Sequence, residues 1–264
     1  MTESELLFTE LLNCSRERLY LNRKYALSRE EGSFLASALK RRVLGEPIQY
    51  ILGGTEFMGL RFKLTADVFI PRPETEILVE TTIKIGHRLK VIGERLKILD
   101  LGTGSGNIAI SLAKFLTDCE IIGIDISGRA LKIAENNARL NNVDNVKFIQ
   151  GNLFSPFTFC LSPFTLIVSN PPYIPTAEIE RLEPELSFEP HNALDGGSDG
   201  LDFYRRIIQE SPAHLKGKGF LIMEMGFNQA EAIKKIFRDS GNFKILEVVK
   251  DYNDIDRVIV AQIG

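Results

Sequence analysis

The sequence has few cysteines and has neither a basic leader nor a long apolar run. Cys14, Cys119 and Cys160 lie far apart and form no CxxC pair, which favours a reducing compartment and gives no spacing typical of a zinc site. The beginning of the chain carries Glu3 and Glu5 in place of a basic segment, and no stretch approaches the roughly 18 apolar residues of a membrane span. We therefore expect a cytoplasmic protein without a metal site or a membrane partner.

The chain also has no excess of positive charge. Its 264 residues contain 32 Lys and Arg against 35 Asp and Glu, a net charge of −3, so no global field attracts nucleic acid. We interpret the densest basic cluster, residues 40–42, as a solvated helix end. With 44% apolar and 25% charged residues, the composition is that of a globular protein with one large domain and a smaller one.

The spacing of apolar residues divides the chain into three parts. From Thr2 to Leu44 they recur at helical spacing, and Thr2 with Glu5 matches the S/T-x-x-E capping box. Ser28 with Glu31 repeats this signature. Short apolar stretches with interspersed glycines then indicate a β-hairpin. The predicted parts are an N-terminal helical domain at 1–47, a hairpin linker at 48–70 and a large domain at 71–264.

The large domain alternates buried strands with helices, after a short helix that we expect to follow Pro73. Its strands are predicted at 97–101, 121–126, 146–149, 164–169, 219–225, 243–249 and 257–263. Helical patterns at 108–116 and 130–140 lie between the early strands. This alternation is typical of βαβ units, so we predict an α/β fold with a mainly parallel, seven-stranded sheet.

A glycine-rich segment, Asp100-Leu-Gly-Thr-Gly-Ser-Gly106, follows the first of these strands and opens a helix. Glycines there allow close approach to a ligand, and the helix N-terminus offers free N–H groups. A dinucleotide fingerprint starting at Gly102 requires glycine where Asn107 stands. Asp125, at the end of the next strand, suits both hydroxyls of a ribose on this loop. The alternatives are an ordinary glycine turn and, for Asp125, a helix N-cap.

The tetrapeptide Asn170-Pro171-Pro172-Tyr173 follows the fourth strand. Two prolines stiffen the backbone, so the Pro171 carbonyl is free to point into a cleft. The amide oxygen of Asn170 and this carbonyl form two acceptors for a planar NH₂ group, and the ring of Tyr173 stacks on it. Drawing both N–H bonds toward acceptors raises electron density on a weakly nucleophilic nitrogen. The alternative is an ordinary proline-rich turn.

Three histidines and one arginine are further candidates. His87 and His214 lie in helical contexts that we expect to be exposed, and His191 lies near the candidate site. A lone histidine is rarely catalytic, so we assign none a role. Arg72, between two prolines, is either a site residue or a solvated turn arginine.

Together with several flanking segments, these motifs resemble the HemK/PrmC family of release factor glutamine methyltransferases over nearly the whole chain. The flanking segments, which separate this family from other amino-methylating enzymes, are 45–53, 69–76, 189–190, 193–194, 199–202 and 224–226. The resemblance implies a class I, Rossmann-like methyltransferase fold and S-adenosylmethionine as methyl donor. The implied acceptor is the side-chain nitrogen (N5) of the glutamine in the Gly-Gly-Gln motif of peptide chain release factors.

The resemblance also implies roles for particular residues. Asn170–Tyr173 grip the substrate glutamine and are catalytic. The implied cofactor contacts are Gly102, Thr103, Gly104, Ser105, Gly106, Asp125, Asn152, Leu153 and Asn170. The chain departs from the family at Asn152, where the family usually has Asp. An amide keeps one acceptor and adds a donor, so an adenine contact needs the amide suitably turned. The alternative for Asn152 is a turn residue.

Two other functions are compatible with these motifs. A nucleic-acid amino-methyltransferase presents a flipped base to the same clamp, but it needs a basic track that the acidic composition does not provide. A non-catalytic adaptor would keep the fold as a scaffold, yet the glycines, Asp125 and Asn170–Tyr173 are intact. We therefore expect a protein substrate and no direct nucleic-acid substrate.

Overall fold

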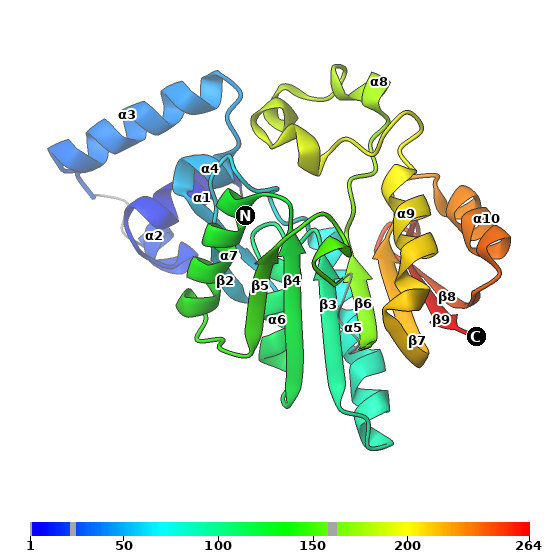
Figure 1. Ribbon diagram of the computed structural model, residues 1–264. Helices are drawn as coiled ribbons and strands as arrows, with labels where there is room; N and C mark the ends of the chain where they lie inside the picture. Colours follow the sequence, from blue (N-terminus) through cyan, green and yellow to red (C-terminus); the bar gives the residue numbers. More distant parts are fainter. Residues whose placement is uncertain (1, 22–24, 158–162) are drawn as a thin grey trace.

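Helices cover both faces of a central sheet, and a smaller group of helices lies beside it (Figure 1). The computed structural model describes residues 2–21, 25–157 and 163–264, so Cys160 lies outside the described residues. Within them, no helix has both the length and the apolar character needed to cross a membrane.

Two of the N-terminal helices begin where the capping patterns predict. The N-terminal helices are α1 (Glu3–Leu11), α2 (Arg16–Leu21), α3 (Arg29–Val43) and α4 (Ile48–Leu52). Thr2 and Glu5 form a complete capping box at α1, and Ser28 and Glu31 form another at α3. Glu5 also accepts hydrogen bonds from Nε of Arg16 at 3.0 Å and from the Tyr20 hydroxyl at 2.6 Å. One carboxylate therefore caps α1 and holds α2 against it.

A two-stranded antiparallel hairpin, β1 (Gly54–Phe57) and β2 (Leu60–Lys63), follows α4. The buried side chain of Asn137 attaches it to the large domain. Its Oδ1 accepts from the backbone N–H of Lys63 at 2.7 Å, and its Nδ2 donates to the carbonyls of Lys63 at 3.1 Å and Ser105 at 2.9 Å. The hairpin is thereby joined to the backbone of the glycine-rich loop.

The helix after Pro73 is much longer than the short helix expected from the sequence. It is α5 (Pro73–Val91), with 19 residues. Its buried face contains Thr75, Thr81, Thr82 and Gly86 beside the aliphatic residues. Because threonine and glycine interrupt the apolar spacing, the sequence pattern predicts too short a helix. A Cβ at Gly86 would lie 3.0 Å from the Leu116 side chain, so this close contact between α5 and its neighbour depends on glycine.

The sheet has seven strands in the order β5-β4-β3-β6-β7-β9-β8. They are β3 (Leu96–Leu101), β4 (Cys119–Asp125), β5 (Val146–Gln150), β6 (Phe164–Ser169), β7 (Leu215–Glu224), β8 (Phe243–Lys250) and β9 (Asp256–Ile263). The first five in this order are parallel, and β9 runs antiparallel to both of its neighbours. The prediction of a mainly parallel α/β sheet is confirmed.

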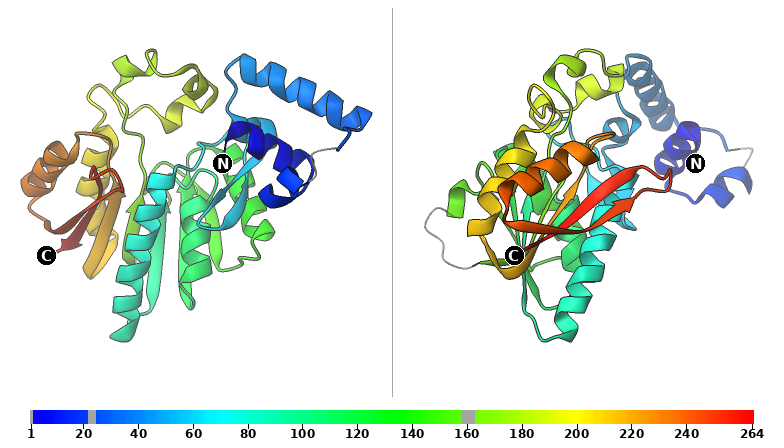
Figure 2. Two further views of the ribbon diagram at one scale, coloured as in Figure 1. Left: turned by 180° about the vertical axis from the view of Figure 1, so that it is seen from behind. Right: turned by 90° about the vertical axis from the view of Figure 1, so that its right-hand side faces the viewer.

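Two apolar clusters fill the two faces of this sheet. One lies under α5, α6 (Asn107–Phe115) and α7 (Gly128–Leu140). The other lies under α9 (Asp202–Glu210) and α10 (Ala230–Ser240), and Figure 2 shows the helices on opposite sides. The remaining short helices are α8 (Thr176–Ile179), η1 (Ser155–Phe157), η2 (Pro184–Phe188), η3 (His191–Ala193) and η4 (Ser211–Ala213). Because β4, β3 and β6 are adjacent and parallel, their carboxyl ends meet at one edge of the sheet.

Candidate active site

A cavity of about 430 Å³ opens where β3, β4 and β6 end. Most residues predicted for the site line it, although they come from distant parts of the sequence. They are Gly102, Thr103, Gly104, Ser105, Asp125, Asn152, Leu153, Asn170, Pro171, Pro172 and Tyr173. The cavity wall also contains Arg72 and Thr75 but none of the three histidines. Its position at the carboxyl ends of parallel strands is where α/β sheets bind ligands.

The glycines of the loop after β3 have two different roles. Gly102 and Gly104 have positive φ values of 74° and 54°, and a Cβ at Gly102 would have no neighbour within 4 Å. At Gly104 the nearest atom would be the Gly102 carbonyl oxygen at 4.0 Å. Gly106 does not line the cavity. A Cβ there would lie 2.8 Å from Ile110 and 3.1 Å from Ala134, so this glycine allows α6 and α7 to pack closely.

Asp125 connects this loop to the end of β4. Its Oδ2 accepts from the backbone N–H of Gly104 at 2.9 Å, and its Oδ1 accepts from that of Ser127 at 2.8 Å. The N-cap of α7 is Ser127, whose hydroxyl accepts from Ala130 at 3.2 Å. Reading Asp125 itself as an N-cap is therefore wrong. Burial raises the pKa of Asp125 against the lowering effect of these backbone donors, and each oxygen keeps a further lone pair for a ligand.

Asp100 supports the same loop from inside the core. The Thr103 hydroxyl donates to its Oδ2 at 2.6 Å, while its Oδ1 has no partner among the described residues. The side chain is fully buried, and burial raises its pKa to about 7 despite the hydrogen bond from Thr103. This carboxyl group therefore fixes the loop conformation without facing the cavity.

Asn170 and the residues after it form a rigid edge of the cavity. The Nδ2 of Asn170 donates to Oγ1 of Thr75 at 3.1 Å. Among the described residues, none donates a hydrogen bond to the carbonyl oxygen of Pro171. The carbonyl of Tyr173 instead accepts from Nε2 of Gln229 at 2.9 Å. Burial raises the pKa of the Tyr173 hydroxyl to about 12, so the ring stays neutral.

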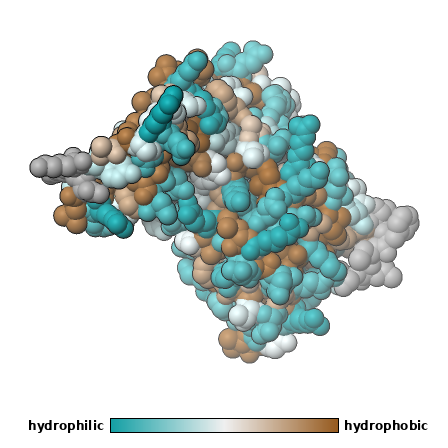
Figure 3. All heavy atoms as spheres, turned by 90° about the vertical axis from the view of Figure 1, so that its left-hand side faces the viewer, coloured by the Kyte–Doolittle hydropathy of each residue, from teal (hydrophilic) through white to brown (hydrophobic). Residues whose placement is uncertain are grey.

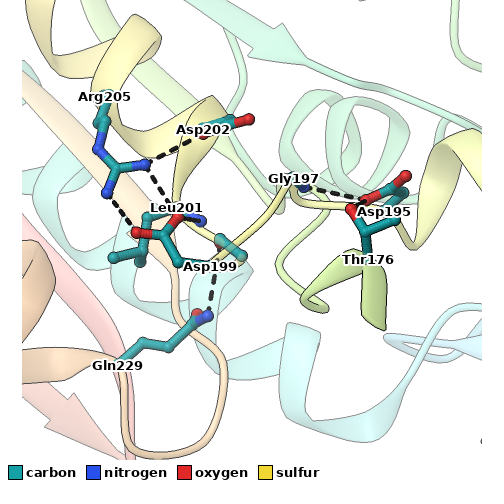
Figure 4. A network of polar contacts seen from close by, with 9 residues as sticks. Thr176, Asp195, Gly197, Asp199, Leu201, Asp202, Arg205 and Gln229 are labelled. Carbon is teal, nitrogen blue, oxygen red and sulfur yellow. Dashed lines mark hydrogen bonds and ion pairs between the residues drawn. The ribbon is translucent and has the colours of Figure 1, made fainter. Parts of the chain in front are cut away.

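A glycine-containing segment, residues 195–202, lies behind this edge, and Figure 4 shows the polar contacts that hold the segment. A Cβ at Gly196 would lie 2.8 Å from the Pro172 carbonyl, and one at Gly200 would lie 2.3 Å from the Tyr173 carbonyl. The segment is held by Asp195, which accepts from the Thr176 hydroxyl at 2.7 Å and from the N–H of Gly197 at 3.0 Å. The two glycines therefore allow the backbone of this segment, held by the hydrogen bonds of Asp195, to lie directly against Pro172 and Tyr173.

The cavity end near β5 contains the residue that departs from the family pattern. Asn152 is exposed, and its Oδ1 accepts from the guanidinium of Arg206 at 3.2 Å. Leu153, which follows it, is buried with a φ of 51°. The amide of Asn152 thus has a cationic donor on its oxygen, a contact that no sequence motif indicates.

The comparisons with known proteins agree with this site. Residues 92–252 match the Methyltransferase domain family, and residues 1–53 match the PrmC N-terminal domain family. The release factor glutamine methyltransferase of Thermodesulfovibrio yellowstonii is 41% identical over 98% of this chain and 91% of its own. That of Geobacter sulfurreducens is 42% identical over 99% of this chain and 89% of its own. The chain belongs to the release factor glutamine methyltransferase family.

Solved structures share the fold of this family member at low sequence identity. A methyltransferase from Pyrococcus furiosus matches with a TM-score of 0.56 and 16% identity, over 90% of this chain and 100% of its own. The hMettl16 catalytic domain, in complex with a 3′UTR hairpin, matches with a TM-score of 0.59 and 18% identity, over 81% and 78% of the two chains. These likenesses confirm the predicted methyltransferase fold.

In this family member, Arg72 and the histidines occupy places that the sequence alone did not fix. Arg72 forms an ion pair with the buried Glu189 and lies over the ring of Phe69, 4.8 Å from its centroid. The ion pair and the aromatic ring therefore hold the Arg72 side chain in place at the cavity wall. His214, expected to be exposed, is half-buried and stacks on Phe154 with centroids 4.6 Å apart. That expectation was wrong because η4 turns the ring onto the second apolar cluster.

His87 and His191 are both exposed. The Nδ1 of His191 lies 3.8 Å from an oxygen of Asp195. Among the described residues, no group of three or more His, Cys, Asp or Glu side chains is arranged to hold a metal ion.

Proposed function

We propose that this chain transfers a methyl group from S-adenosylmethionine to the side-chain nitrogen of the glutamine in the Gly-Gly-Gln motif of release factors. The observation that carries the proposal is the rigid Asn170–Tyr173 edge on the cavity between β3, β4 and β6. The names of relatives that align over almost the whole chain support the same substrate. Because release factors act in translation, the proposed location is the cytoplasm.

The residues of the cavity fit the proposed cofactor. Gly102 and Gly104 leave open space where a Cβ would otherwise stand, so a flat ligand can approach the loop. Asp125 keeps lone pairs for the two ribose hydroxyls, and Asn152 and Leu153 line the wall beyond it. When bound, S-adenosylmethionine supplies a methyl group activated by a positively charged sulfur. Within this fit, Gly106 shapes the loop and does not touch the ligand.

The substrate nitrogen is activated by acceptors and by position. Oδ1 of Asn170 and the carbonyl of Pro171 accept hydrogen bonds from its two N–H groups. These bonds raise the electron density on the nitrogen, which amide conjugation otherwise lowers. The ring of Tyr173 lies against the amide plane and fixes its tilt. The new N–C bond would form as the methyl–sulfur bond breaks, which would leave a neutral thioether, and the nitrogen would release one of its two protons to solvent. Alignment and electrostatics carry the reaction, so no separate base is required.

The two competing functions fit the structure less well. Arg41 forms an ion pair with Glu46, and Arg42 pairs with Glu3 and Glu185. The basic cluster at 40–42 is therefore largely neutralised and offers no track for phosphates. A non-catalytic adaptor has no need for the close backbone packing behind Pro172 and Tyr173.

We further propose that the N-terminal helices bind the body of the release factor and orient its glutamine loop. Several apolar side chains on these helices are exposed, and Figure 3 shows apolar side chains spread among hydrophilic ones on this side of the molecule. They are Tyr20, Leu21, Phe34, Leu39, Val43 and Leu44. A glutamine side chain is small and common, so specificity requires contacts remote from the reacting atoms. The proposed division into residues 1–47, 48–70 and 71–264 assigns this role to the first part.

The decisive test is methyl transfer from isotope-labelled S-adenosylmethionine to purified release factor. We expect label on the glutamine of the Gly-Gly-Gln motif and none on a release factor with Gln replaced by Ala there. Label on added DNA or RNA, with none on the release factor, would favour the nucleic-acid function instead.

A further inference from the structure

Two buried polar side chains lie directly behind Asn170. Thr75 is in the first turn of α5, and Glu224 is the last residue of β7. Ser169 pairs with Met223 across the neighbouring strands β6 and β7, so Asn170 and Glu224 occupy adjacent positions just beyond that pair. Thr75 and Glu224 are each 1% exposed. Three distant parts of the chain thus bring polar groups together under the substrate clamp.

The hydrogen bonds in this cluster have a direction. Nδ2 of Asn170 donates to Oγ1 of Thr75 at 3.1 Å. The Thr75 hydroxyl and the Asn170 amide lie near Glu224, and both lower its pKa, which favours the charged carboxylate. A carboxylate only accepts hydrogen bonds, so a charged Glu224 favours the donor Nδ2 of Asn170, and not its oxygen, on this side of the amide. Among the described residues, none donates to the amide oxygen of Asn170, and Asn170 lines the cavity.

This direction decides what Asn170 can do. An asparagine amide presents either an acceptor oxygen or a donor NH₂ group to its surroundings, and a half-turn about the last bond exchanges them. A glutamine NH₂ group can be gripped only by the oxygen, since two donors repel each other. A turned amide would therefore place hydrogen atoms against the substrate hydrogen atoms.

Among the described residues, Glu224 forms no ion pair that accounts for its burial, because the nearest guanidinium pairs with another carboxylate. Its Oε2 has no hydrogen bond among the described residues. The nearby Arg257 is bound to Asp251, with nitrogen–oxygen distances of 2.9 and 3.2 Å, and to the Met225 carbonyl at 3.2 Å. A buried carboxyl without full hydrogen bonding lowers stability, and such groups cluster at functional sites.

We propose that Thr75 and Glu224 are positioning residues that hold the Asn170 amide with its oxygen toward the substrate. The inference rests on the proposed function, because it takes the substrate to be an amide gripped by Asn170. Neither residue touches the reacting atoms. Their effect is on the fraction of enzyme whose amide is correctly turned, and therefore on kcat.

The proposal predicts a specific pH dependence. Burial raises the pKa of Glu224 to about 7, opposed by the Thr75 hydroxyl, the Arg257 guanidinium and the Asn170 amide. Ionised Glu224 accepts hydrogen bonds and orients the amide, whereas protonated Glu224 becomes a competing donor. Activity should therefore rise as the pH increases through about 7 and then level off.

Two tyrosines and an arginine that face Glu224 do not titrate in that range. Tyr173, beside the cavity, has its pKa raised to about 12 by burial. Burial also raises the pKa of Tyr204 on α9 well above its usual value. Arg257 on β9 stays charged at any relevant pH, while Glu74 on α5 adds a negative charge that favours protonation of Glu224.

The test compares four full-length variants: Thr75→Val, Thr75→Ser, Glu224→Gln and the control Thr82→Val. Thr82 is fully buried on the same helix, but among the described residues its hydroxyl donates only to the Leu78 carbonyl, at 2.8 Å. Assays use saturating release factor and S-adenosylmethionine from pH 5.5 to 9, and calorimetry measures cofactor affinity. We expect Thr75→Val and Glu224→Gln to lower kcat roughly 10- to 100-fold with cofactor affinity unchanged. Thr75→Ser should restore kcat, and Glu224→Gln should remove the rise near pH 7.

A double variant tests the direction of the hydrogen bonds and needs no pH profile. Asn170→Asp places an oxygen against Glu224, so the two carboxylates repel each other. Adding Glu224→Gln supplies an NH₂ group that donates to the new Asp. We expect the double variant to be at least about tenfold more active than Asn170→Asp alone, which purely structural damage cannot produce because two losses would then accumulate.

Failure of this proposal is distinct from failure of the proposed function. If wild-type enzyme does not methylate the release factor glutamine, the function is wrong. If it does, but Thr75→Val and Glu224→Gln keep the wild-type kcat and pH profile, the positioning role is overturned. Equal losses in Thr75→Val, Thr75→Ser and Thr82→Val would also overturn it, since they would reflect damage to α5. If Glu224→Gln does not fold, the kcat of Thr75→Val compared with that of Thr75→Ser decides whether the positioning role holds.

Discussion

The backbone N–H of Gly104 donates to the carboxylate of Asp125 at 2.9 Å, which joins the loop after β3 to the end of β4. Gly104 has a φ of 54°, a conformation that glycine adopts without strain. A residue with a side chain at this position would both strain the loop and fill the space above it. The hydrogen bond therefore depends on glycine, and the shape of the cavity depends on the hydrogen bond.

Gly104→Val should abolish binding of S-adenosylmethionine. The added side chain enters open space at the cavity wall and favours a different φ. Calorimetry measures the affinity. The matched control is Gly93→Val, because Gly93 has a φ of 83° and open space around it but lies outside the cavity wall. Unchanged affinity in Gly104→Val, or loss in both variants, would contradict this explanation.

The cavity should bind S-adenosylmethionine and not NAD. Asn107 stands where a dinucleotide fingerprint has its third glycine, and Asn107 lies in the cavity wall. Calorimetric titration of the wild-type protein with each ligand distinguishes them. Comparable affinity for NAD would overturn the cofactor assignment.

Asn170→Ala should lower the methylation rate by about two to three orders of magnitude. The substitution removes one of two acceptors for the substrate NH₂ group, and losses of this size are usual for preorganised polar groups at a reacting centre. Some cofactor binding should remain, because the glycine loop and Asp125 are untouched. Near wild-type turnover on saturating release factor would show that the amide clamp is not the mechanism.

The parallel core strands were predictable because they are buried on both faces and appear as continuous apolar runs. Every residue of β6 is buried, and its predicted bounds match the structure. Helices α9 and α10 were not predicted. Each begins without a side-chain cap, so the S/T-x-x-E pattern that marks α1 and α3 is missing at both.

The same contrast holds at the site. The Asn170–Tyr173 tetrapeptide and the glycine loop are contiguous motifs, so residues adjacent in the sequence are enough to predict their chemistry. Thr75 lies 95 positions from its partner Asn170, and Gln229 lies 56 positions from Tyr173. Such contacts arise from the order of strands in the sheet, which local patterns do not specify.

The docking role of the N-terminal helices can be tested by surface substitutions. Val43 and Leu44 are 86% and 71% exposed at the end of α3. Cutting the chain at Gly45 is a poorer test, because it would uncover Ile48 and Ile51, which pack with Leu7 and Ala38. We expect the double substitution Val43→Asp and Leu44→Asp to reduce kcat/KM for intact release factor while leaving cofactor affinity unchanged.

The control for this experiment is the pair Val91→Asp and Ile92→Asp. These residues are 87% and 73% exposed at the far end of α5. Since that end lies away from the N-terminal helices (Figure 1), kcat/KM should not change. An equal effect of both pairs, or none from either, would refute docking at the end of α3.

Two buried carboxyl groups should make the protein less stable as the pH rises. Burial raises the pKa of Asp100 from 3.8 to about 7 and that of Glu224 from 4.5 to about 7. Between about pH 4 and 7 the folded protein therefore keeps protons that the unfolded chain releases. By linkage, the contribution of these groups to the free energy of unfolding falls across this window and levels off above it.

Glu224→Gln should remove part of that pH dependence, because the amide is neutral at every pH. Relative to wild type, the variant should gain on the order of 1–3 kcal/mol of unfolding free energy between pH 5 and pH 8. Urea unfolding at pH 5, 6.5 and 8 measures this difference, with Glu247→Gln on the exposed face of β8 as the control. A variant whose unfolding free energy followed the wild-type curve at all three pH values would mean that Glu224 is ionised throughout. If Glu224→Gln has a higher unfolding free energy at pH 8 together with a lower kcat, the charged carboxylate beneath Asn170 lowers the stability of the enzyme but raises its activity.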